Sequence, residues 1–216
     1  PSAVRFIMSN KKPWKQLFTG RFTINHTNNI IMEDAAAPAL GYFGSRGWQY
    51  RYLGNAPDGL LLSAAYRTMQ NTIGLKLVPS AANGEGDATA TGRERPECRG
   101  CHFDSPYGLD LVARLLPRKV GVGGAAKPQL VAVTPQTLFN GLQVRDHEHL
   151  LEVLTSSEAF RFRTCRLAFE FVYGRPESAC EAPMFDRCME AFSRTGMVQD
   201  ALASYLEDPQ YCEAVP

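Results

Sequence analysis

The hydrophobic positions in the C-terminal part of the chain recur at helical spacing. Residues 155–158 have the spacing of a capping box, and Gly174 with the proline that follows it is typical of a helix end. Residues 146–154, 184–192 and 198–206 predict three further helices. The helix between the capping box and Gly174 is indicated by five apolar residues: Phe160, Leu167, Ala168, Phe171 and Val172. This part of the chain is therefore predicted to be helical.

The middle of the chain has a weaker helical pattern, interrupted by segments rich in small residues. Residues 59–70, capped by Asp58, and residues 109–116 each predict a helix. Residues 79–92 and 121–127 carry Gly, Ala, Ser and Asn with few bulky apolar groups, which predicts surface loops or linkers. The expected fold class is mainly α, with long loops between the helices.

The first sixty residues are less regular. Pro13 is typical of the first turn of a short helix, predicted over residues 13–18, and residues 21–25 follow an extended pattern. Between residues 41 and 59 aromatic side chains alternate with glycines, which predicts loop and short strand packed against another part of the molecule.

Composition excludes several classes of protein. The chain has 216 residues, of which 44% are hydrophobic and 21% charged, as in ordinary globular proteins. A formal net charge of +1 gives no electrostatic reason to expect binding to nucleic acid or to a membrane surface. No apolar run approaches the ~18 residues of a membrane span. The sequence shows no leader, so we expect any export signal to have been removed or to lie upstream.

One short motif carries the strongest chemical signal in the chain: Cys98-Arg99-Gly100-Cys101-His102. C-x-x-C-H is the attachment sequence for c-type haem, in which two thiols form thioethers and the histidine ligates the iron from the proximal side. A redox-active C-x-x-C pair or half of a zinc site are the alternatives. The Pro-rich and Gly-rich flanks argue against the first, and the next cysteine, Cys165, lies too far along the chain for the second. We therefore expect one covalently bound haem c.

The function of such a haem depends on the ligand opposite His102. A thioether or imidazole there favours single-electron transfer, whereas an open position admits peroxide or oxygen. Met184, which follows a proline, and Met197, at a predicted helix start, are the candidates we rank first. An open position remains an alternative. His147 and His149, at the start of a charged helix, are expected to be exposed.

Arginines beside the motif are candidate partners for the haem propionates. Arg99, and either Arg93 or Arg95, would lower the cost of burying those carboxylates. The alternative is that all of them are solvated side chains.

The four cysteines outside the motif lie near the C-terminus: Cys165, Cys180, Cys188 and Cys212. An even number of cysteines in a protein that attaches haem outside the cytoplasm indicates two disulfides. Three pairings are possible, and we favour Cys180–Cys188 and Cys165–Cys212. Four reduced thiols in the core are the alternative.

Together these residues resemble the C-terminal cytochrome c-type modules of large secreted proteins from planctomycetes and myxobacteria. The resemblance covers most of the chain. It includes residues 12–25, residues 59–109 with the haem motif, and residues 139–176 with the run Tyr173-Gly174-Arg175-Pro176. Ser105 interrupts the family's Asp-Pro pair, and Asp110 stands near the family's glutamate. The resemblance implies an exported haem protein and specifies no reaction.

The motif and the resemblance predict a helical, c-type cytochrome-like domain. We expect residues 1–57 to form a segment that packs on the haem domain, residues 58–128 a haem module, and residues 129–216 a helical module with two disulfides. The expected function is that of a periplasmic or extracellular monohaem cytochrome, whose partner is a redox protein or a membrane-associated electron-transfer complex. A peroxidase-like haem enzyme with an open distal site is the main alternative, and a structural subunit is a third.

Overall fold

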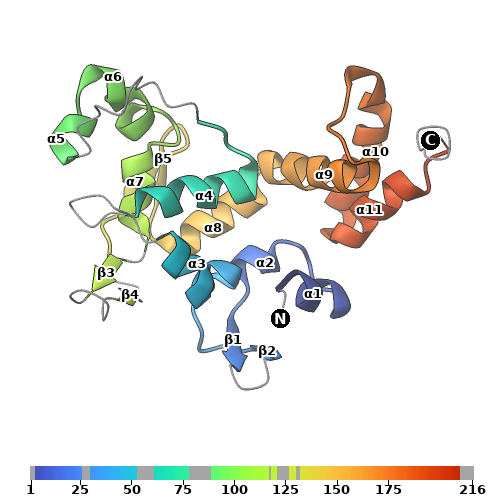
Figure 1. The fold of residues 1–216 in the computed structure, drawn as a ribbon, viewed down its shortest axis with the longest axis horizontal. Helices are drawn as coiled ribbons and strands as arrows, with labels where there is room; N and C mark the ends of the chain where they lie inside the picture. Colours follow the sequence, from blue (N-terminus) through green and yellow to red (C-terminus); the bar gives the residue numbers. More distant parts are fainter. Residues whose placement is uncertain are drawn as a thin grey trace. The chain divides into compact units, whose positions relative to one another are not determined.

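The computed structural model shows a mainly helical protein, which confirms the predicted fold class (Figure 1). The structure describes residues 3–25, 30–52, 61–77, 89–116, 118–120, 127–129 and 132–209. Most of the loop predicted at 79–92 and most of the linker predicted at 121–127 lie outside these ranges. The chain forms two compact units. Unit 1 comprises residues 1–42, 72–74 and 153–216, and unit 2 comprises residues 43–71 and 75–152.

Unit 1 joins the beginning of the chain to its end. Its elements are α1 (Ala3–Ser9), α2 (Gln16–Thr19), β1 (Phe22–Asn25), β2 (Ile30–Glu33), α9 (Glu158–Tyr173), η4 (Ala179–Glu181), α10 (Ala182–Thr195) and α11 (Val198–Leu206).

Helices α9, α10 and α11 pack together as a three-helix bundle, the orange to red part of Figure 1. Phe169 and Tyr205 are completely buried in it, with ring centroids 5.3 Å apart. The same burial raises the pKa of the Tyr205 hydroxyl. A disulfide between Cys165 and Cys188 joins α9 to α10. Aromatic packing and one covalent bond therefore hold this bundle together.

The helix ends of the bundle agree with the sequence pattern. Gly174 and Gly196 both adopt the left-handed conformation, with φ of 68° and 69°, and end α9 and α10. Helix α9 is capped two residues later than predicted: its cap is Ser157, whose hydroxyl accepts a hydrogen bond from the backbone N–H of Phe160. Thr155 belongs instead to the preceding helix.

The N-terminal residues of unit 1 lie against this bundle. The backbone N–H of Trp14 donates to the carbonyl of Gly196 over 2.7 Å, and the rings of Phe18 and Phe160 meet edge to face at 5.5 Å. Strands β1 and β2 form an antiparallel pair in which Phe22 is opposite Glu33. The expected extended segment at residues 21–25 is therefore a hairpin strand.

Unit 2 is built from shorter elements, apart from two helices that continue into unit 1. Its elements are η1 (Gly41–Gly44), α3 (Arg46–Arg51), α4 (Leu62–Ile73), α5 (Ala90–Arg93), α6 (Pro96–Arg99), η2 (Gly100–Asp104), α7 (Leu109–Leu115), β3 (Arg118–Val120), β4 (Lys127–Gln129), β5 (Gln136–Leu138), β6 (Leu142–Val144) and α8 (His147–Ser156). The strands form two antiparallel pairs, β3 with β4 and β5 with β6.

The described part of the aromatic and glycine-rich stretch, residues 41–52, is mostly helical instead of the loop and strand expected there, and residues 53–59 lie outside the described ranges. Ser45 caps α3 by accepting a hydrogen bond from the N–H of Trp48, and the Trp48 ring packs on buried Phe43. A local cap and a ring contact therefore decide the conformation, where the sequence had no clear periodicity.

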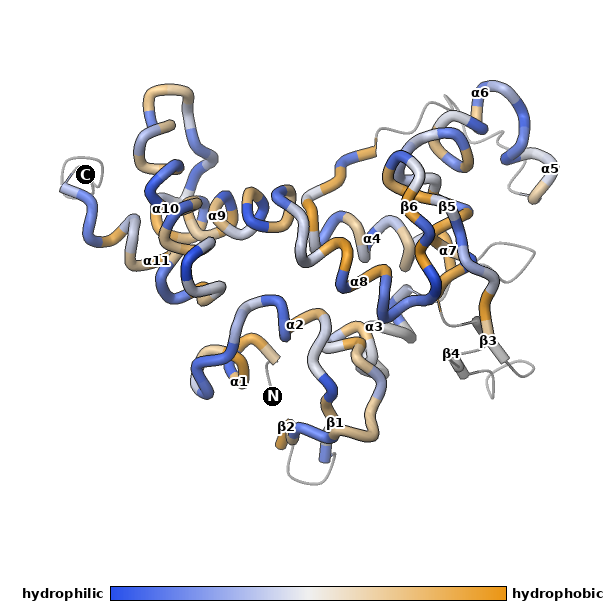
Figure 2. The backbone as a smooth tube through the Cα atoms, turned by 180° about the vertical axis from the view of Figure 1, so that it is seen from behind, coloured by the Kyte–Doolittle hydropathy of each residue, from blue (hydrophilic) through white to orange (hydrophobic). Residues whose placement is uncertain are grey.

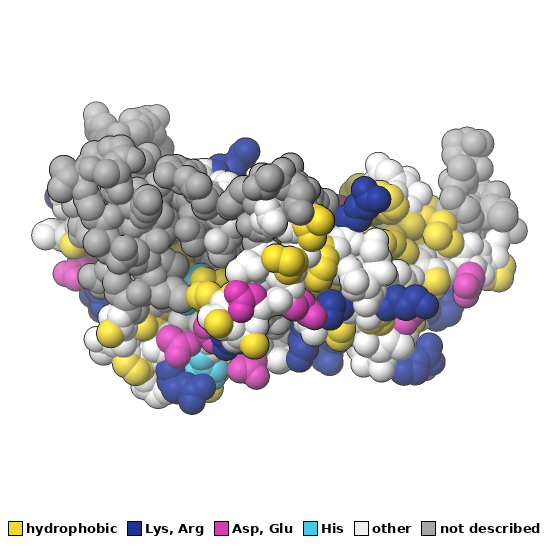
Figure 3. All heavy atoms as spheres, turned by 90° about the horizontal axis from the view of Figure 1, so that it is seen from below, with side chains coloured by type: hydrophobic (Ala, Val, Ile, Leu, Met, Phe, Trp, Pro, Cys, Tyr) yellow, Lys and Arg dark blue, Asp and Glu magenta, His cyan; other side chains and the backbone are white. Residues whose placement is uncertain are grey.

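Helix α8 alternates hydrophobic and hydrophilic positions, visible as orange and blue along its tube in Figure 2. Leu150, Leu151 and Leu154 of this helix are buried. Among the described helices, none combines the length and the apolar character required to cross a bilayer. On the face shown in Figure 3, positive, negative and hydrophobic side chains are interspersed over the described surface.

Candidate haem site

The C-x-x-C-H motif lies on one continuous helical segment in unit 2. Pro96 opens α6 in its first turn, and from Gly100 the segment continues as the π-helical η2. The N–H of Ser105 donates to the carbonyl of Gly100 over 2.9 Å, which is the wider spacing of a π-helix. Cys98 lies in α6, and Cys101 and His102 lie three and four positions further along, in η2.

A tight turn follows the motif and fixes the direction of α7. A Cβ atom added to Gly108 would lie 3.0 Å from the carbonyl oxygen of Phe103 and 3.3 Å from that of His102. A side chain at this position would require its neighbours to move, so glycine favours the close approach of the start of α7 to the motif.

Both thiols of the motif are accessible. Cys98 is partly exposed and Cys101 is exposed, and neither forms a disulfide within the described part of the chain. Accessible cysteine side chains are what thioether formation at a C-x-x-C-H motif requires.

The imidazole of His102 is anchored by a buried carboxylate. Its Nδ1 lies 2.5 Å from Oδ2 of Asp110, whose side chain is only 1% exposed. Because an ionised carboxylate only accepts hydrogen bonds, this contact favours the tautomer in which Nδ1 carries the proton, and in a neutral imidazole of that tautomer the lone pair is on Nε2. Arg93 closes the arrangement: its Nε lies 2.9 Å from Oδ1 and 3.2 Å from Oδ2 of the same carboxylate. His102 therefore presents Nε2 as a metal ligand in a fixed orientation.

The outer surface of the motif carries a second, exposed ion pair. Arg99 Nε lies 3.0 Å from Asp104 Oδ1, and both side chains are about half exposed. The guanidinium groups of Arg99 and Arg114 lie over the ring of Phe103, at 5.8 and 5.6 Å from its centroid. Arg99 and exposed Arg95 therefore remain candidates for propionate contacts, whereas buried Arg93 is engaged with Asp110.

The two methionines ranked first as distal ligands both belong to unit 1, whereas His102 belongs to unit 2. Met184 is 2% exposed and fills the interior of the bundle from α10, the common use of methionine in a core. Met197 is the residue before α11.

The predicted disulfide pairing was wrong. Cys165 bonds to Cys188, with Cα atoms 5.9 Å apart, instead of to Cys212. Cys180, the expected partner of Cys188, is exposed and has no disulfide partner among the described residues. Cys212 lies outside the described residues. The packing of α10 along α9 brings Cys188 to Cys165, a tertiary contact that cysteine spacing does not reveal.

His147, expected to be exposed, is buried at the start of α8. Its side chain is 5% exposed, and neither ring nitrogen has a hydrogen-bond partner within the described residues. Burial disfavours the charged imidazolium and lowers the pKa of His147 to about 4. His149, two positions further along α8, accepts a hydrogen bond from the N–H of Arg145. His147 is therefore a neutral core residue of unit 2.

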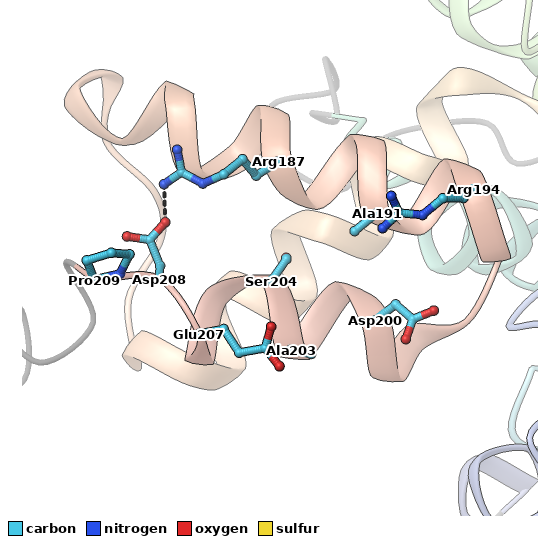
Figure 4. A pocket seen from close by; sticks show the side chains of 9 residues that line it. All are labelled: Arg187, Ala191, Arg194, Asp200, Ala203, Ser204, Glu207, Asp208 and Pro209. Atoms are coloured by element: carbon cyan, nitrogen blue, oxygen red, sulfur yellow. Dashed lines mark hydrogen bonds and ion pairs between the residues drawn. The ribbon is translucent and has the colours of Figure 1, made fainter.

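A separate pocket of about 460 Å³ lies in unit 1 between α10 and α11 (Figure 4). Arg187, Arg194, Asp200 and Glu207 give it charge of both signs. The buried carboxylate of Asp208 at one end is already paired with Arg187. The pocket offers no cluster of catalytic groups comparable to the arrangement around His102.

The residues around the motif include the side-chain types that attachment of a c-type haem requires. Within the described ranges no three His, Cys, Asp or Glu side chains are arranged to hold a metal. The chain supplies two accessible thiols and one imidazole whose Nδ1 is occupied, the set required by a covalently attached porphyrin. Sequence reasoning named Arg93 only as a possible propionate partner and did not connect Asp110 with His102. The only signal was an acidic residue eight positions after the histidine.

Comparisons with known proteins add no further constraint. None of the family models, curated proteins or solved structures with which the chain was compared matches it.

Proposed function

We propose that this protein is a monohaem c-type cytochrome that carries single electrons outside the cytoplasm, alone or within a larger redox complex. The observation that supports this most directly is the combination of Cys98, Cys101 and His102 on one helical segment with Asp110 bonded to Nδ1. The resemblance of the motif and its flanks to secreted cytochrome c-type modules points to the same class. The disulfide between Cys165 and Cys188 is consistent with an oxidising compartment such as the periplasm.

Each residue has a defined role in this proposal. Cys98 and Cys101 would each add sulfur and hydrogen across one vinyl group, which fixes the porphyrin as two thioethers. His102 would ligate the iron through Nε2, and Arg99 would lie near the propionates. A haem bound in this way supplies an iron that alternates between its ferric and ferrous states. One electron would enter from a reduced redox protein and leave to an oxidised one.

The His102–Asp110 hydrogen bond also favours a second candidate, a haem enzyme with an open distal site. A proximal ligand that donates electron density stabilises iron in higher oxidation states and assists cleavage of a bound peroxide. Carrier and enzyme differ in whether the sixth coordination position is filled.

Two measurements on the purified chain test the proposal. The intact mass of the wild-type chain should exceed the mass of the polypeptide by one haem. The Cys98→Ser, Cys101→Ser double variant should lack this extra mass. A wild-type chain that lacks the extra mass would refute haem attachment. The Cys180→Ser variant, which removes a thiol outside the motif, should keep the haem. Carbon monoxide should leave the reduced spectrum of a carrier unchanged, and rapid binding would instead favour the peroxidase-like enzyme.

A further inference from the structure

We propose that Asp110, held by Arg93, is a positioning residue that orients His102 toward the iron of a bound haem and lowers the reduction potential of that iron. This inference rests on the proposed function. It assigns a role to two residues that neither the motif nor the resemblance assigns.

The geometry separates Asp110 from an ordinary surface acid. Its Oδ2 lies 2.5 Å from Nδ1 of His102, and the Asp110 and Arg93 side chains are 1% and 4% exposed. Asp110 lies in the first turn of α7, and Gly108 allows that turn to approach the motif closely. The carboxylate is therefore buried beside the one imidazole in the motif.

A carboxylate is a stronger acceptor than the neutral groups that could occupy this position. A hydrogen bond from Nδ1–H to an anion leaves more electron density on the ring, and so on Nε2. A more basic ligand stabilises ferric iron more than ferrous iron, which lowers the reduction potential. The low dielectric around Asp110 strengthens this effect, because water does not screen the charge.

Arg93 makes the arrangement possible. An unpaired buried carboxylate would cost several kcal/mol, and the guanidinium compensates for part of that cost. The Nε of Arg93 contacts both carboxylate oxygens, at 2.9 and 3.2 Å, so the carboxylate is held in the orientation that faces His102. A purely structural ion pair between Arg93 and Asp110 would not require a third group. Here the partly exposed His102 is that group, with its Nδ1 2.5 Å from Oδ2 of Asp110.

The Asp110→Asn variant tests the role of the charge. The amide oxygen of asparagine still accepts the hydrogen bond from Nδ1, so orientation is kept while the negative charge is removed. We expect at least a tenfold shift in the ratio of reduced to oxidised haem at fixed potential, an increase of about 59 mV in midpoint potential for one electron. Glu94→Gln, which removes an exposed carboxylate next to Arg93 in sequence, is the matched control and should leave the midpoint unchanged.

The outcomes distinguish this inference from the proposed function. A wild-type chain without haem refutes the function itself. A haem-loaded Asp110→Asn variant whose midpoint equals that of the Glu94→Gln control overturns this inference alone.

A measurement on the wild-type holoprotein covers the case in which Asp110→Asn does not fold. In the reduced protein, nitrogen-15 NMR should show a protonated Nδ1 on His102 whose proton exchanges with solvent more slowly than the ring protons of His149. Exchange as fast as that of His149 would overturn the inference.

Discussion

The α9–α11 bundle and the motif segment from α5 to α7 are stabilised in different ways. The bundle has helices of 16, 14 and 9 residues, an interior of aromatic side chains and a disulfide. The motif segment has helical stretches of four to seven residues, and its buried groups include the charged pair Arg93 and Asp110. Short helices gain little from local hydrogen bonding alone. The bundle therefore has the contacts of a self-sufficient core, whereas the motif segment uses buried charge to orient a histidine.

We expect the largest change in stability when the aromatic core of the bundle is altered. Phe169→Ala should lower the free energy of unfolding by about 3–5 kcal/mol, because the fully buried ring leaves a cavity among Tyr173 and Tyr205. Urea denaturation followed by circular dichroism measures the change. Phe171→Ala on the same helix is the control, since its side chain is 80% exposed and should change stability by no more than about 0.5 kcal/mol. Similar losses for both variants would contradict the assignment of the core.

The disulfide is the second test of the bundle. Replacing Cys165 and Cys188 together by alanine should cost about 3 kcal/mol, because the bond restricts a loop of 23 residues in the unfolded chain. Thermal unfolding under non-reducing conditions measures the loss. Cys180→Ala should leave the melting temperature unchanged, and a shift as large as that of the double variant would point to a different pairing.

The buried imidazole of His147 provides a test within unit 2. The unfolded chain takes up a proton on this residue near pH 6.5, whereas the folded chain does so only near pH 4. Stability is therefore complete above about pH 6.5 and falls as the pH decreases toward 4, by roughly 2–3 kcal/mol at about pH 4.5. Urea midpoints at about pH 7.5 and about pH 4.5 measure this.

His147→Leu should remove most of that pH dependence, because leucine has no proton to bind. His149→Leu is the matched control on the same helix and should retain it. Equal pH dependence in the two variants would show that another group is responsible.

The smallest expected effect concerns the start of α9. Ser157→Ala should cost about 1 kcal/mol, because it removes the hydroxyl that accepts from the N–H of Phe160. Ser157→Asp, which can accept the same bond, should retain most of the stability in the same urea assay. A loss for Ser157→Asp as large as that for Ser157→Ala would contradict the capping role.

The contrast between local helical signals and tertiary contacts explains how much of the fold could be predicted from the sequence. The helix predicted at residues 198–206 matches α11, and Gly174 ends α9 as expected, because helical periodicity and glycine caps are local signals. The pairing of Cys165 with Cys188 and the contact between Arg93 and Asp110 join residues 23 and 17 positions apart. Such contacts depend on how helices pack, which local patterns do not encode.

The site divides in the same way. The identities of Cys98, Cys101 and His102 were available from their spacing, because a single helical segment carries all three. The contact between His102 and Asp110 could not be predicted from the spacing, because it depends on the turn at Gly108, which brings Asp110 close to the motif. The burial of His147 was also missed, since a charged neighbourhood in sequence suggested a solvated face.

The location of the disulfide separates two kinds of sulfur chemistry in one chain. Cys165 and Cys188 are completely buried, whereas Cys101 is exposed and Cys98 partly so. Thiol–disulfide exchange requires an attacking thiolate to reach a sulfur atom. A mild thiol reductant therefore reacts faster with the exposed sulfurs of the motif than with the buried disulfide. The motif cysteines can accordingly be kept as thiols under conditions in which the cross-link between α9 and α10 stays intact.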